Sequence, residues 1–186
     1  MQEEEQVIRI TQNWIERLII AHQICPFASK VHQLGQIHYR VMAEQGLEKK
    51  LLAVQQSLQL LKEQAKWDTA FLIFPQSFIH DFLAYLDFVA MSEALLHDLG
   101  YEGVYQIATF HPQYQFAGTS LDDPANYTNR SPFSMLHFLR EASVEQALKH
   151  YENPEAIPER NIAFARKEGL DRMKERLKSC HKLSED

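Results

Sequence analysis

The chain has 186 residues, of which 45% are hydrophobic, and a formal net charge of −6 at pH 7. That length is typical of one domain, so we expect a single α/β domain over residues 1–186. The acidic balance argues against a nucleic-acid binder, which needs a concentrated basic face. No run of about 18 or more apolar residues occurs, so we expect no membrane partner, and the acidic start MQEEEQ is unlike a secretory signal. A cytoplasmic location is the default expectation.

Helical and strand patterns alternate along the chain. They predict, in order, a helix over 3–23, a strand over 36–42, a helix over 47–66, a buried strand over 70–74, a helix over 78–99 capped by Ser77, and a strand over 104–110. Helix signals return after a long loop: Ser131-Pro132 as a start, a capping box of Ser143 and Gln146, and a last helix from Ile157-Pro158 to about Lys178.

These connections predict a small three-stranded, mainly parallel sheet covered by about six helices, because strand–helix–strand crossovers are right-handed. An antiparallel first strand at the sheet edge is the alternative. In the parallel case the strand ends at Phe74 and Phe110 lie on the same carboxyl rim, where open α/β sheets bind ligands.

A long aperiodic connection, residues 110–132, begins at that rim. Connections of about 20 residues without regular structure are usually functional or disordered. This one carries Phe110, Tyr114, Phe116 and Tyr127, and aromatic residues are scarce in disordered segments. We therefore predict a rim site formed by the 110–132 loop.

His111 and Arg130 are the strongest candidates in this loop. His111 directly follows a buried strand and is a candidate general base or acid; the alternative is a rim histidine that bonds a loop carbonyl. Arg130, with the backbone amides of residues 131–133 at a predicted helix start, is typical of an anion site. The alternative is that Arg130 pairs with Asp122 or Asp123 and only holds the loop.

Shorter polar groups around Arg130 complete the candidate substrate-binding set, which comprises Arg130, Asn129, Ser131, Asn126 and Tyr114. We expect them to orient an anionic small molecule. Taken singly, such residues more often bond their own backbone in turns.

Cys25 is the candidate nucleophile, although it follows the C-terminus of the predicted first helix. The negative end of a helix dipole disfavours a thiolate, so a buried small residue is the competing interpretation. A nearby His111 or Arg130 would reverse that judgement. Cys25 and Cys180 are not expected to form a disulfide in a reducing compartment, and no CxxC pair indicates a structural zinc site.

Three segments resemble the signatures of the domain of unknown function 1415 family: Cys25-Pro26-Phe27-Ala28, Phe110-His111-Pro112 with Tyr114-Gln115-Phe116, and Thr128-Asn129-Arg130-Ser131-Pro132 with the helix expected after it. The resemblance covers nearly the whole chain, and the family supplies no activity. It gives added weight to Cys25, His111, Asn129 and Arg130, and it suggests that Cys25 is brought near the loop.

Three hypotheses remain open from the sequence. The first is a small hydrolase or group transferase in which His111 and Cys25 act on an anionic substrate held by Arg130. The second is a non-catalytic ligand-binding or protein-interaction domain whose polar loop is structural. The third is a metal or haem protein that uses His111 with His22, Cys25 or His137, for which no cofactor is indicated by spacing. A buried Arg130 with its donors used by protein groups favours the second.

Overall fold

The centre of the computed structural model, which describes residues 2–78, 80–149 and 151–182, is a four-stranded sheet in the order β1–β2–β4–β3. Its strands are β1 (Ile37–Val41), β2 (Thr69–Phe74), β3 (Tyr105–Phe110) and β4 (Ser134–Arg140). β1 and β2 pair in parallel, whereas β4 is antiparallel to both of its neighbours. The α/β class is confirmed, but the prediction of three mainly parallel strands is wrong, because a fourth strand lies between β2 and β3.

The fourth strand replaces the helix predicted after Ser131-Pro132. Met135 and Leu139 pack on one face of the sheet, and Leu136 and Phe138 pack on the other. A strand that is buried on both faces shows no alternation between apolar and polar residues, so periodicity could not reveal it. The residues 131–133 therefore do not begin a helix, and their amides form no helix N-terminus.

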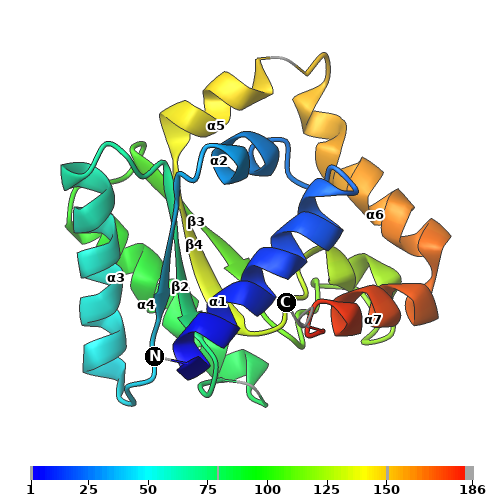
Figure 1. The fold of residues 1–186 in the computed structure, drawn as a ribbon, viewed down its shortest axis with the longest axis horizontal. Coiled ribbons are helices and arrows are strands. Elements are labelled where there is room, and N and C mark those ends of the chain that lie inside the picture. Colours follow the sequence, from blue (N-terminus) through cyan, green and yellow to red (C-terminus); the bar gives the residue numbers. More distant parts are fainter. Residues whose placement is uncertain (1, 79, 150, 183–186) are drawn as a thin grey trace.

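Helices cover both faces of the sheet (Figure 1). One face packs against α3 (Leu47–Glu63) and α4 (Phe82–Asp98). The other packs against α1 (Gln2–Trp14), the π-helical turn η1 (Ile15–Ile20) and α2 (Ala28–Gln33). α6 (Ile157–Glu168) and α7 (Leu170–Ser179) add residues to the same cluster and contact the 124–128 turn. α5 (Glu141–Leu148) follows β4, and two short 3-10 helices, η2 (Pro124–Thr128) and η3 (Pro154–Ala156), complete the described part of the chain. The seven α-helices there exceed the predicted number by one.

Three helix boundaries differ from their predictions for local reasons. Asp81, not Ser77, caps α4, because its side chain accepts a hydrogen bond from the Ala84 amide at 2.9 Å. Ser143 donates to the Asp68 carboxylate at 3.0 Å and forms no capping box. The predicted last helix is broken at Gly169, whose φ of 82° and ψ of 162° no helix allows.

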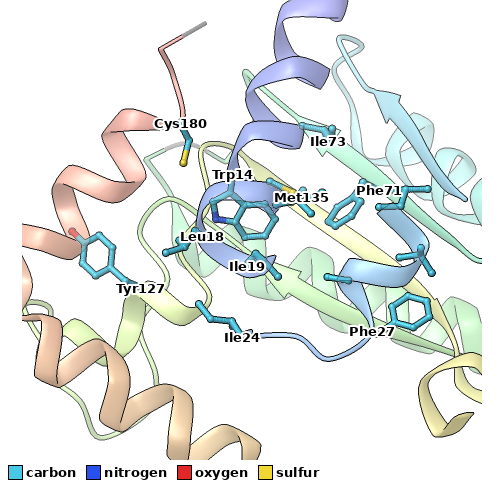
Figure 2. Packing of buried hydrophobic residues seen from close by; sticks show 14 of the residues in the cluster. Trp14, Leu18, Ile19, Ile24, Phe27, Phe71, Ile73, Tyr127, Met135 and Cys180 are labelled. Carbon is cyan, nitrogen blue, oxygen red and sulfur yellow. The ribbon is translucent and has the colours of Figure 1, made fainter. Parts of the chain in front are cut away.

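The first helix also changes character. Its α-helical part ends at Trp14, and a wider π-helical turn of six residues carries the chain to Ile20. Isolated π-helical turns are rare and frequently lie at functional sites. Here the turn places Ile15, Leu18 and Ile19 against the sheet, in the cluster shown in Figure 2.

Candidate functional site

The 110–132 loop is held together by its own side chains and backbone. Asn126 is fully buried at its centre, where its Oδ1 accepts from the Phe116 amide at 3.0 Å and shares the proton of the Thr119 hydroxyl, 2.9 Å away, with the Phe116 carbonyl. Its Nδ2 donates to the Ser120 carbonyl at 2.9 Å. Every strong hydrogen-bonding group of this amide is therefore used inside the loop, which leaves none for a ligand.

Arg130 also bonds to the loop itself. Its Nε donates to the Tyr114 carbonyl at 3.0 Å, and one Nη donates to the Leu121 carbonyl at 2.9 Å. The guanidinium lies over the Tyr127 ring, 4.6 Å from its centroid, and the residue is 8% exposed. Asp123 pairs with Arg166 at 2.8 Å, so the alternative in which Arg130 pairs with Asp123 is wrong, although Arg130 does hold the loop through its carbonyls.

His111 is fully buried and has no free ring nitrogen. Its Nδ1 accepts from the Gln113 amide at 2.9 Å, which places the proton on Nε2, and Nε2 donates to the Phe78 carbonyl at 2.7 Å. Burial lowers the pKa of His111, against the opposing effect of the Phe78 carbonyl. The arrangement matches the structural alternative, a rim histidine that bonds a loop carbonyl.

The remaining candidates of the loop are similarly occupied. Asn129 donates from Nδ2 to the Thr109 carbonyl at 3.2 Å, which ties the loop back to β3. Ser131 is fully buried and donates to the Phe133 carbonyl at 2.6 Å. The Tyr114 ring packs against Phe116, with the centroids 5.0 Å apart. Four of the five candidate binding residues, Arg130, Asn129, Ser131 and Asn126, thus use their side chains on protein groups.

Cys25 and His111 lie on opposite faces of the sheet. The His111 ring contacts Phe82 and Tyr85 of α4, with centroids 5.1 Å and 5.0 Å away. Cys25 packs with the cluster on the α1 face. A thiol–imidazole pair of Cys25 and His111 is therefore not formed, although the far end of the loop reaches the α1 face, where Trp14 Nε1 donates to the Arg130 carbonyl at 3.2 Å.

The thiol of Cys25 instead borders an apolar cavity of about 90 Å³ between the sheet and the segment from α1 to α2. Figure 2 shows Trp14, Ile19, Ile24 and Phe27 on the helical side of this region and Phe71 on the strand side. The lining residues are Trp14, Ile15, Ile19, Ile24, Cys25, Phe27, Ala28, Val31, Ile37, Phe71, Ala108, Phe110, His137 and Leu139. Cys25, Ala108 and Phe110 are the partly exposed members, and they indicate where the cavity reaches the surface.

Cys25 follows the first helix, as predicted, but a second short helix that was not predicted, α2, begins three residues later. Burial raises the pKa of the Cys25 thiol, while the amides of Phe27 and Ala28 oppose that rise. The group is thus a neutral, partly exposed thiol at the cavity wall.

His137 forms part of the cavity floor and is the one histidine there. It projects from β4 towards the α1 face, and its ring stacks on Phe71 with centroids 3.8 Å apart and planes 8° apart. Burial without a charged partner lowers its pKa to about 3. The imidazole is therefore neutral at pH 7.

No group of three or more His, Cys, Asp or Glu side chains in the described part of the chain is placed to hold a metal ion. His22, one of the histidines considered for such a site, stacks on Phe164 at 4.7 Å instead. Within the described ranges, no helix is long and apolar enough to cross a membrane.

A family model described as "Protein of unknown function (DUF1415)" matches residues 6–175. The chain belongs to this family. No curated protein and no solved structure matches it. The resemblance read from the three signature segments is confirmed, and the function of this DUF1415 protein has to be argued from its own geometry.

The helix predicted to begin at Ser131-Pro132 includes His137, so the sequence did not indicate that this residue lies on β4 of the DUF1415 protein. One signal was available. The run Met135 to Leu139 is apolar apart from the histidine, as expected for a strand buried on both faces. The side chain of a histidine inside such a run lies in the core on one face of the sheet or on the other.

Proposed function

We propose that the protein is a ligand-binding domain that takes up a small apolar molecule in the cavity between the sheet and the η1–α2 segment. The observation that carries the proposal is the cavity itself, about 90 Å³ with an almost wholly apolar lining, open to the surface at one side. At about 24 cal/mol per Å³, a sealed empty cavity of this size would cost roughly 2 kcal/mol of folding stability, which is an upper bound for one that reaches the surface. Alanine stands at two lining positions, Ala28 and Ala108, where a larger side chain would fill part of the space.

The architecture around the cavity supports this proposal. The π-helical turn contributes Ile15 and Ile19 to its lining, and a rare backbone conformation of this kind is often retained for function. The cavity also reaches the surface beside the edge strand β3, through which a ligand could enter. Under this proposal the 110–132 loop has a structural role, consistent with its internally used polar groups.

A second candidate is an anion site at Arg130, the interpretation that the sequence favoured. One observation supports it: the second Nη of Arg130 has no hydrogen-bond partner among the described residues, and the residue borders a surface groove of about 540 Å³. Asp122 borders the same groove, and its carboxylate would repel an anion. The enzyme hypothesis based on His111 remains a prediction that the geometry does not support.

The reactivity of the Cys25 thiol can show whether a ligand occupies the cavity. Toluene that occupies the cavity should slow alkylation of Cys25 by iodoacetamide, followed by peptide mass spectrometry, while Cys180 stays unreactive because it is fully buried. Toluene at ten times its Kd should also stabilise the fold by about 1.4 kcal/mol. That corresponds to roughly 3–6 °C in Tm for a chain of this size.

Ala108→Leu should abolish both effects, because the longer side chain enters the cavity. The matched control is Ala90→Leu on the exposed side of α4, which should leave both effects unchanged. If toluene alters neither the alkylation rate nor Tm of the natural protein, the proposal is wrong. Stabilisation by benzoate that survives Ala108→Leu but is lost in Arg130→Gln would support the rim groove instead.

A further inference from the structure

His137 holds a fixed orientation at the floor of the cavity. It pairs across the sheet with Phe71 of β2 on one side and Ala108 of β3 on the other. The close stacking on Phe71 fixes the ring plane. The residue is 8% exposed, so the cavity is the space that its edge borders.

Thr69 determines which ring nitrogen of His137 carries the proton. The Thr69 hydroxyl lies 2.6 Å from the Phe138 carbonyl and 2.5 Å from His137 Nε2. A carbonyl only accepts, so the single hydroxyl proton goes to Phe138, and Nε2–H must donate to Thr69. The other nitrogen, Nδ1, is therefore left as an unprotonated acceptor.

No hydrogen bond to Nδ1 is formed within the described residues, and Nδ1 is not among the fully buried atoms that lack a partner, so part of its surface is accessible from the cavity that His137 lines. An acceptor that faces an apolar cavity lacks the hydrogen bond that it would make with water. The other polar lining groups do not donate a hydrogen bond to Nδ1, because Trp14 Nε1–H donates to the Arg130 carbonyl and the Cys25 thiol is only a weak donor. The cavity thus offers one strong acceptor and no free strong donor.

From this arrangement we propose that the ligand is a neutral molecule with an apolar body and one hydrogen-bond donor, such as a phenol or a small alcohol, and that the donor binds His137 Nδ1. The inference rests on the proposed function and names the chemical class of its ligand. A carboxylate is excluded because the neutral imidazole cannot balance its charge in an apolar wall. A ligand with only acceptors is excluded because it would face the Nδ1 lone pair.

Phenol and toluene test this selectivity, because they have nearly the same shape and differ in the donor. In a purely apolar cavity phenol is strongly disfavoured, since its buried hydroxyl would have no partner. We expect the natural protein to bind phenol at least as tightly as toluene by calorimetric titration. Anisole, in which a methyl group replaces the hydroxyl proton of phenol, should bind more weakly than phenol.

His137→Phe removes the acceptor and keeps a flat ring against Phe71. It should lower the ratio Kd(toluene)/Kd(phenol) by about tenfold or more, the equivalent of one buried hydrogen bond. Thr69→Val should lower the same ratio without touching the ligand, because a valine no longer holds the proton on Nε2. The matched control is Thr11→Val, a buried threonine that bonds the Val7 carbonyl within α1 at 2.9 Å and does not line the cavity.

The outcomes separate the two proposals. Toluene binding with an unchanged ratio in His137→Phe and Thr69→Val would overturn the inference and leave the apolar cavity as a binding site. Failure of both phenol and toluene to bind the natural protein would overturn the proposed function as well. A reduced ratio in both variants, with the Thr11→Val protein unchanged, is the expected result.

Discussion

Replacing Asn126 by alanine should destabilise the fold strongly, because this one amide closes the 110–132 loop. The variant loses two bonds to Oδ1, at 3.0 and 2.9 Å, and one from Nδ2 at 2.9 Å, all in a fully buried position. At about 1 kcal/mol for each bond, we expect a loss of roughly 3 kcal/mol in the free energy of unfolding. Equilibrium unfolding in urea measures it, with the m-value unchanged if the folded state keeps its extent.

The control for Asn126→Ala is Asn153→Ala. Asn153 is exposed at the start of η3 and makes no side-chain capping bond there, so its loss should change stability by less than about 0.5 kcal/mol. If Asn126→Ala also costs less than about 0.5 kcal/mol, the loop is not held by this residue. The structural role assigned to the loop would then lose its main support.

Two further predictions concern stability. Burial lowers the pKa of His137 in the folded state to about 3, below its ordinary value of 6.5, so the unfolded chain binds more protons between these values and stability falls as pH drops through that window. The natural protein should therefore lose up to about 1.4 kcal/mol per pH unit relative to His137→Phe in acid unfolding curves, and parallel curves would contradict a buried neutral imidazole. Gly169→Ala should lower the free energy of unfolding by about 1–3 kcal/mol in thermal unfolding, because Gly169, between α6 and α7, has a φ of 82° and a ψ of 162°, which alanine rarely adopts. A loss below about 0.5 kcal/mol would mean that the two helices can reorient freely.

Most of the helices and strands could be predicted from the sequence, because each is indicated by the pattern of a short stretch of neighbouring residues. The strand at residues 70–74 is bounded by Asp68 and Pro75, and the helix over 47–66 has a clear apolar period, so both were predicted nearly to their ends. The fourth strand was missed because Ser131-Pro132 reads as a helix start. Pairing with β2 and β3 determines that this segment is a strand, and a short stretch of sequence cannot reveal such long-range contacts.

The site was harder to predict than the fold. The sequence indicated the polar loop. However, polar residues that hydrogen-bond to one another have the same composition as polar residues that bind a ligand, and only the geometry of Asn126 and Arg130 distinguishes the two. The apolar cavity leaves no sequence signal at all, because it depends on how small residues such as Ala108 meet a π-helical turn. His137 becomes a candidate only because the register between β2 and β4 places it beside Phe71.

A crystal structure of the protein soaked with phenol tests the central claim most directly. We expect the ring in the cavity bordered by Trp14, Ile19 and Phe110, with the hydroxyl within about 3 Å of His137 Nδ1. An empty cavity at saturating phenol, or phenol bound only in the groove beside Arg130, would contradict the account.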